Sequence, residues 1–198
     1  MKKKDWKDIT LKQFLMIQEL LTEPDEYLTF NLLDVVYGID SASLTVSELA
    51  PYKDALNFLN ESIPHVKLNS EYTLNGTVYE SNFDLTVVTV AQFVDYQNYI
   101  REENPSFNKL LSVFFVPKGM EYNKGYDIKK VQDDLLELDI CSVVTLAFFF
   151  EIQLSIFLSS FQRSSIKSVK KMKVSKEQKR AMIKKLEEMD LSSLISFP

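Results

Sequence analysis

Residues 72–79 read YTLNGTVY and residues 89–99 read TVAQFVDYQNY, and these two stretches decide the fold class. In the first, Asn75-Gly76 stands between two runs that alternate apolar and polar residues. Asn-Gly is the pair that a two-residue type I′ turn prefers, so this stretch predicts a β-hairpin. The second stretch opens with Thr89-x-x-Gln92, the spacing of a helix capping box, and therefore predicts a helix.

Helical signals fill most of the remaining chain. Gly and Pro are scarce, with 4 and 6 residues in a chain of 198, and this favours long regular elements. Capping boxes, apolar spacing and breaker residues mark where helices are expected to start and stop. Helices are expected to run from Thr10 to Thr22, from Pro24 to Gly38, from Thr45 or Ser47 to Pro64, from Thr89 to Asn104, from Phe107 to Val116, from Asp127 to Leu138 and from Ile140 to Phe161. The last helix is expected to start at Ser175.

We therefore expect a mainly α protein with one β-hairpin, an α+β fold. A compact helical domain is expected over residues 1–162, with the hairpin near 66–88 and strand alternation already from Val66. A basic C-terminal helical arm is expected over residues 163–198.

The run CSVVTLAFFFEIQLSIFLSSF, residues 141–161, resembles a membrane span in length and apolar content. Glu151 and Gln153 fall near its middle, where an ionisable group would be costly in a bilayer. A central core helix, apolar nearly all round, fits these polar positions better. We therefore expect no membrane partner. The basic opening MKKKDWKD leads into a helix that carries charges, so no secretory signal is expected either.

Residues suited to catalysis or metal binding are few. Cys141 is the only cysteine and has apolar neighbours, and His65 is the only histidine. The usual nitrogen and sulfur ligands of zinc cannot be assembled from one of each, and Cys141 does not resemble an activated thiol. Asp133-Asp134 and Glu187-Glu188 are adjacent in sequence, so we expect solvated helix faces. No catalytic, cofactor-binding or metal-binding residue is predicted, and we expect neither a cofactor nor enzymatic activity.

Charge is distributed unevenly along the chain. From Arg163 to Lys185 there are ten basic residues and the single acid Glu177, a net charge of 10 − 1 = +9. The whole chain carries −5, so the remainder carries −14. The candidate residues for binding a partner or nucleic acid are Arg163, Lys167, Lys170, Lys171, Lys173, Lys176, Lys179 and Arg180.

This basic arm supports two interpretations. Lysine and arginine side chains bind the phosphates of nucleic acid, with a strong dependence on salt. Aromatic side chains that stack on bases are lacking between Arg163 and Lys185, which favours an acidic protein surface as the partner. The acidic body of a neighbouring copy is one such surface. Exposed hairpin edges and the charge split together predict a homo-oligomer.

The layout resembles small proteins encoded in the virion-morphogenesis genes of tailed bacteriophages, including those of gut Bacteroides and crAss-like phages. The matching features are short and lie between residues 6 and 160. They are Trp6-x-x-Ile9-Thr10-Leu11-x-Gln13-Phe14, Tyr37-Gly38, Tyr72-x-Leu74-Asn75-Gly76-x-x-Tyr79, Thr89-x-x-Gln92-Phe93-x-Asp95-Tyr96-Gln97, Val116-Pro117-Lys118-Gly119, Gly125-Tyr126-Asp127-Ile128 and Phe148-Phe149-Phe150.

The resemblance implies a tail-assembly, chaperone-like or head–tail structural protein, and it brings no catalytic residues. Expected partners are then other phage virion or tail proteins, and the expected location is the virion or the host cytoplasm during assembly. A nucleic-acid-binding phage accessory or packaged protein that uses the lysine-rich arm is the alternative.

Overall fold

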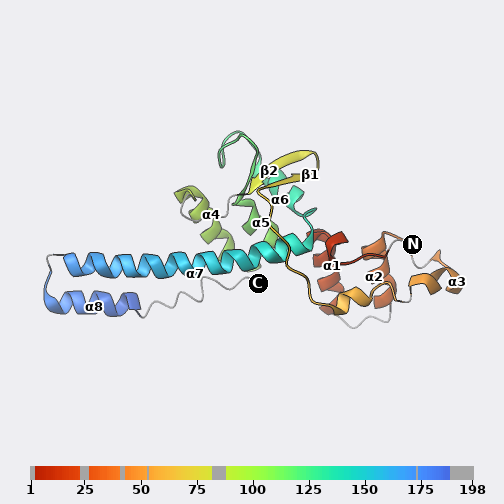
Figure 1. Cartoon of the computed structure of the whole chain (residues 1–198), viewed down its shortest axis with the longest axis horizontal. Coiled ribbons are helices and arrows are strands. Elements are labelled where there is room, and N and C mark those ends of the chain that lie inside the picture. The colour runs from red at the N-terminus through yellow and green to blue at the C-terminus, as the bar shows by residue number, and fades with distance from the viewer. Residues whose placement is uncertain are drawn as a thin grey trace. The chain divides into compact units, whose positions relative to one another are not determined.

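The computed structural model describes residues 3–22, 27–40, 43–52, 54–81, 88–172 and 174–187, with the side chains of 151, 153–162, 186 and 187 excepted. The chain is mainly helical with one small antiparallel sheet, which confirms the expected α+β class (Figure 1). It divides into two units. Unit 1 comprises Met1–Asn82 and Ser106–Leu146, and unit 2 comprises Phe83–Pro105 and Ala147–Pro198.

Unit 1 contains five helices among its described residues and the start of a sixth. They are α1 (Leu11–Thr22), α2 (Leu28–Tyr37), α3 (Val46–Leu49), α5 (Phe107–Ser112), α6 (Ile128–Leu135) and the first turns of α7 (Ile140–Lys171). Short 3-10 turns cover Trp6–Asp8, Ala50–Tyr52 and Asn57–Asn60.

Local signals set several helix ends as expected. The N–H of Gln13 donates to the Thr10 hydroxyl at 3.3 Å and the Gln13 side chain accepts from the Thr10 N–H at 3.1 Å, which confirms the capping box before α1. Gly38 ends α2 with φ +67°, a left-handed conformation that glycine adopts without strain, and its N–H donates to the Asp34 carbonyl.

The sheet has three strands in the order β1 (Glu71–Leu74), β2 (Thr77–Ser81) and β3 (Phe115–Pro117), all antiparallel. Asn75 and Gly76 connect the first two strands with φ of +47° and +77°, as a type I′ turn requires, so the predicted hairpin is confirmed. The third strand was not expected. Phe115 pairs with Ser81, and the helix predicted over residues 107–116 ends at Ser112.

Two further expectations are corrected. The helix predicted from Thr45 to Pro64 is only one turn long before it gives way to 3-10 turns, because Pro51 has no N–H and its ring clashes with the preceding turn. The alternation from Val66 does not form a strand before Glu71. Pro24 and residues 83–87, for which a helix start and a strand continuation were predicted, lie outside the described residues.

An aromatic cluster and backbone bonds close the core of unit 1. Trp6 lies edge-on to Phe58, with ring centroids 5.3 Å apart, and its indole N–H donates to the Glu61 carbonyl at 2.9 Å. The first helix is joined to the segment between α6 and α7 because the Leu11 N–H donates to the Leu138 carbonyl at 2.8 Å. Apolar side chains from both ends of the unit are fully buried there, among them Ile9, Leu11, Leu138, Ile140 and Leu146.

Unit 2 contains α4 (Val90–Ile100), the rest of α7 and α8 (Lys176–Glu187). The capping box of α4 is confirmed, since the Gln92 N–H donates to the Thr89 hydroxyl at 3.2 Å. α7 is one continuous helix of 32 residues. The predicted change from helical domain to arm, at residues 162 and 163, falls within α7 and stays a prediction.

The apolar run at the start of α7 is partly core. Cys141, Val143 and Phe150 are buried, whereas Phe148 is exposed. The core therefore covers only one side of this part of α7. Glu151 has no described side chain. Within the described residues, no helix combines the length and the apolar content that crossing a membrane requires.

Candidate functional site

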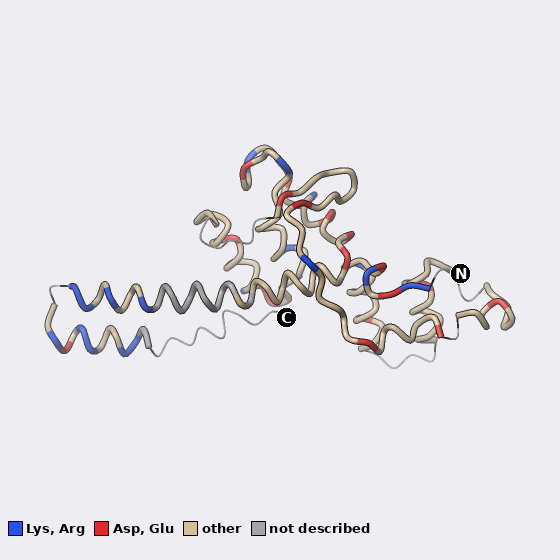
Figure 2. The backbone as a smooth tube through the Cα atoms, viewed as in Figure 1, with Lys and Arg blue, Asp and Glu red and all other residues tan. Residues whose placement is uncertain are grey.

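The basic residues of the arm lie in rows along two helices. A helix repeats every 3.6 residues, so Arg163, Lys167 and Lys170 share one face of α7. By the same spacing, Lys176 and Arg180 share one face of α8. All five side chains are exposed. Figure 2 shows Lys and Arg recurring along the C-terminal part of α7 and along α8. The result is a surface of closely spaced positive charges.

An apolar seam, made of Ile166, Val169 and Ile183, lies beside the rows of basic residues on these helices. Val169 and Ile166 on α7 are buried and half-buried, respectively, and Ile183 on α8 is half-buried. Most other residues around them are charged or polar. Charged side chains alone would not bring α7 and α8 together because their like charges repel. Burial of these aliphatic side chains stabilises the pair by removing apolar area from water.

Hydrogen bonds cap the end of α7 and the start of α8. Lys179 on α8 donates from Nζ to the carbonyl of Lys170, 3.1 Å away in the last turn of α7. That carbonyl has no partner within its own helix, so the lysine caps α7 and compensates the negative end of its dipole. At the start of α8, the Gln178 N–H donates to the Ser175 hydroxyl at 3.2 Å, which confirms the predicted capping box.

The predicted binding residues are thus brought together, with one difference of role. Lys179 is half-buried and holds the hairpin of α7 and α8, so it is less available to a partner than its neighbours. Lys173 lies outside the described residues. The exposed members of the set, which define the basic face, are Arg163, Lys167, Lys170, Lys171, Lys176 and Arg180.

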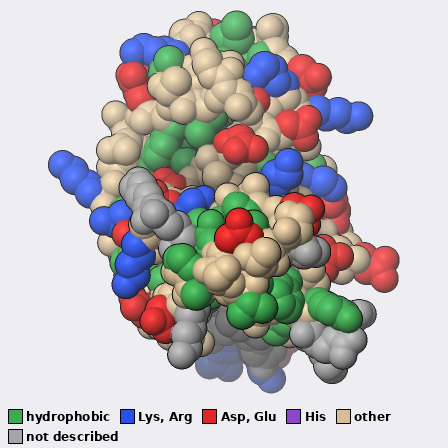
Figure 3. Space-filling view, turned by 90° about the vertical axis from the view of Figure 1, so that its right-hand side faces the viewer, with side chains coloured by type: hydrophobic (Ala, Val, Ile, Leu, Met, Phe, Trp, Pro, Cys, Tyr) green, Lys and Arg blue, Asp and Glu red, His purple; other side chains and the backbone are tan. Residues whose placement is uncertain are grey.

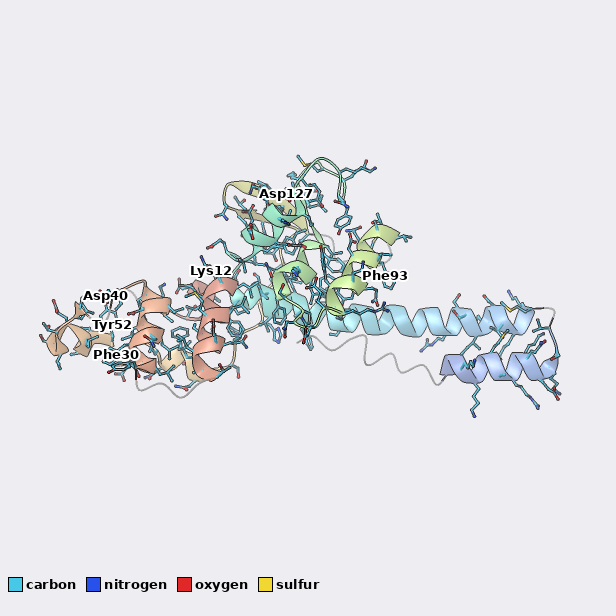
Figure 4. The ribbon with its side chains drawn as sticks, turned by 180° about the vertical axis from the view of Figure 1, so that it is seen from behind. Lys12, Phe30, Asp40, Tyr52, Phe93 and Asp127 are labelled. Carbon is cyan, nitrogen blue, oxygen red and sulfur yellow. The ribbon has the colours of Figure 1, made fainter. Side chains whose placement is uncertain are left out.

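An open apolar groove in unit 1 is a second candidate site, and the sequence analysis did not predict it. Its volume is about 490 Å³. Side chains from α1, α2, α3 and the 3-10 turns line it, including Leu21, Phe30, Leu33, Leu49, Tyr52 and Leu59. Figure 4 labels Phe30 and Tyr52, which come from different elements and meet at this groove. Hydrophobic side chains open to the surface beside acidic ones are visible on this side in Figure 3.

One carboxylate of unit 1 that was expected to be solvated is buried. Asp134 on α6 is 5% exposed, so the prediction of a solvated face is wrong for Asp134. It accepts hydrogen bonds from Asn75 Nδ2 at 3.0 Å, from the Tyr79 hydroxyl and from Lys130 Nζ. Each donor satisfies part of a charge that burial would otherwise penalise. This cluster joins the hairpin to α6 and is structural.

Cys141 and His65 are the groups that could support nucleophilic catalysis. Burial, with help from Asp139 and Asp5, raises the pKa of the Cys141 thiol to about 11, which keeps it protonated and a poor nucleophile at neutral pH. His65 is exposed in the segment that leads to β1. Among the described residues, His, Cys, Asp and Glu side chains form no group of three that could hold a metal ion.

Comparison with known proteins adds no relative. No family model, no curated protein and no solved structure matches this chain.

Proposed function

We propose that the protein is a non-enzymatic virion assembly or structural protein of a tailed bacteriophage, acting in tail assembly or at the head–tail or portal region. It works by binding other virion or tail proteins and copies of itself. The sequence resemblance between residues 6 and 160 supports the phage context. One structural observation carries the binding role, namely the basic face held on the paired helices α7 and α8.

The basic face suits an acidic protein surface. Its cations project from helices that an apolar seam and a capping lysine hold in place, so less backbone freedom is lost on binding. Clustered charges of one sign also speed association with an oppositely charged partner and make it sensitive to salt. The protein would act in the host cytoplasm during assembly, and it would stay in the virion if it is a structural part.

Purified virions provide the first test. Mass spectrometry that finds the protein at a fixed copy number identifies a structural part, whereas its absence from virions together with binding to tail or portal proteins identifies an assembly chaperone. Absence from virions and no binding to tail, portal or neighbouring virion proteins would overturn the proposal.

A matched pair of variants tests the basic face. In the first variant, Lys167→Glu, Lys170→Glu and Arg180→Glu reverse three of its charges. In the control, Lys12→Glu, Lys67→Glu and Lys129→Glu reverse three exposed lysines of unit 1, so both variants change net charge equally. We expect the first variant to lose partner binding in pull-down and the control to keep it.

Nucleic-acid binding is the second candidate function, because the same cations would contact phosphates. The observation in its favour is the density of lysine and arginine from Arg163 to Lys185. Retention on a DNA column at low salt, lost in the basic-face variant and kept in the control, would support it. A wild-type protein that passes through the column while it still binds virion proteins would exclude it.

A further inference from the structure

The groove of unit 1 lies in the most acidic part of the chain. Residues 13–61 contain nine acidic residues and one basic residue, Lys53, so their net charge is 1 − 9 = −8. Acidic side chains stand next to residues that line the groove. Glu48 precedes Leu49 on α3, and the Asp54 carboxylate accepts a hydrogen bond from Asn57 at 3.5 Å. Both carboxylates are exposed, so the groove offers apolar surface within a negative field.

The tip of the arm has the opposite charge and a matching apolar character. Met172 is 46% exposed and Val174 is 37% exposed, at the point where α7 gives way to α8. Lys170 and Lys171 precede these two residues, and Lys176 follows them. A partner that covers these two side chains would remove their apolar area from water. Methionine in particular adapts its shape to an irregular pocket.

We propose that the acidic groove of one copy receives the arm tip of a second copy. Met172 and Val174 would enter the apolar floor beside Phe30, while the flanking lysines would face the acidic surroundings. The net charges, −8 for residues 13–61 and +9 for residues 163–185, are nearly equal and opposite. This inference rests on the proposed function, in that the protein works through protein–protein contacts.

The contact joins two different surfaces, so every copy keeps one unused groove or tip until a ring closes or a filament ends. Head-to-tail assembly is the kind of growth that virion parts with repeated subunits need. It also gives a decisive experiment, because each surface can be disabled in a separate copy.

The groove variant is Phe30→Lys, which places a charge of the arm's own sign in the groove. Its control is Val46→Lys, since Val46 is 86% exposed in the same acidic region and does not line the groove. The tip variant is Met172→Glu with Val174→Glu, and its control is Ser164→Glu with Ser168→Glu, two exposed positions elsewhere on the arm. Circular dichroism and thermal melting verify that all four fold.

Sedimentation velocity of the full chain at micromolar concentration is the measurement. We expect the wild type and both controls to assemble in low salt and to dissociate in high salt. Each single-surface variant should be a monomer by itself, with self-association weakened by about tenfold or more. An equimolar mixture of the groove variant and the tip variant should form a 1:1 dimer and nothing larger, since only one pair of intact surfaces remains.

Three results would overturn the inference. They are a monomeric wild type in low salt, folded variants that assemble like the wild type, and a variant mixture that stays monomeric. Pull-down with tail and portal proteins separates these failures from that of the proposed function. A monomeric wild type that binds those proteins keeps the function and loses the self-contact, whereas a wild type that binds neither loses both. Loss of tail-protein binding in the groove variant, with self-assembly unchanged, would assign the groove to that partner instead.

Discussion

The Tyr79 hydroxyl on β2 donates a hydrogen bond to the Asp134 carboxylate on α6, across a separation of 55 residues in the chain. Asn75 in the turn and Lys130 on α6 donate to the same carboxylate. The hairpin, its turn and α6 therefore share one buried acceptor, and the position of the sheet on unit 1 depends on it.

We expect Asp134→Ala to lower the free energy of unfolding by about 2–3 kcal/mol, because the buried Tyr79 hydroxyl and the Asn75 amide lose a charged acceptor. Urea unfolding followed by circular dichroism measures the effect. Asp133→Ala is the control, since Asp133 is exposed and its removal should change stability by about 0.5 kcal/mol or less. Equal losses in the two variants would show that the cluster contributes nothing specific.

The same carboxylate makes stability depend on acid pH. Burial by itself raises the pKa of Asp134, but hydrogen bonds from Lys130, Tyr79 and Asn75 outweigh burial and lower the pKa below its ordinary value of 3.8. A carboxyl group with a lowered folded pKa contributes stability that is present above the unfolded pKa. That contribution is lost as pH falls through the folded pKa.

We therefore expect the urea midpoint to fall as the pH drops below about 4. Asp134→Asn should flatten that part of the profile, since an amide does not titrate there. An unchanged acid profile in Asp134→Asn would assign the acid sensitivity to other carboxyl groups.

Local signals explain what the sequence could predict. The capping boxes at Thr10, Thr89 and Ser175 are confirmed because each needs only residues within one turn of helix. The type I′ turn at Asn75-Gly76 is likewise complete within the hairpin. Charge density alone located the basic arm, since most side chains of a segment with many like charges remain exposed.

Contacts between distant residues explain what the sequence could not predict. β3 forms because Phe115 pairs with Ser81 on β2. The local sequence of residues 107–116 indicates a helix and contains no sign of this distant strand partner. The sequence does not distinguish Asp134 from its neighbour Asp133, because the donors that allow Asp134 to be buried come from the distant hairpin. The groove combines residues of α1 and α2 with others after residue 48, and no spacing along the chain marks them as one surface.

Cys141 should resist thiol reagents in the folded protein. Burial and nearby acidic groups raise the pKa of its thiol from 9.0 to about 11, so the reactive thiolate is rare as well as covered. Ellman's reagent at pH 8 should react only after urea is added. Rapid reaction without urea would show that the first turns of α7 open readily.

The raised pKa of Cys141 also predicts a loss of stability in alkali. The thiol ionises more easily in the unfolded chain, so its contribution is fully present below pH 9.0 and is lost as pH rises through about 11. Urea midpoints measured across this window should fall with pH. A smaller fall is expected in Cys141→Ala, and an identical fall would assign the effect to buried tyrosines.

Lys179 and Lys176 should differ when each is replaced by methionine. Both substitutions remove one positive charge, but only Lys179 caps the Lys170 carbonyl of α7. We expect Lys179→Met to speed amide hydrogen exchange in the last turn of α7, at residues 168–171, while Lys176→Met leaves it nearly unchanged. Equal protection in the two variants would mean that the apolar seam alone holds the hairpin.

Each unit of this protein is assembled from two separated stretches of chain, and α7 runs from one unit into the other. During synthesis, the hairpin of residues 71–81 emerges well before β3 and Asp134, the groups that complete its sheet and bury its turn. A chain stopped after residue 105 would hold the beginning of unit 1 and a fragment of unit 2, each without its counterpart. Proteases should therefore find a ribosome-released fragment of that length an easy substrate, and cleavage resistance should arise only once the residues up to Leu146 have been made.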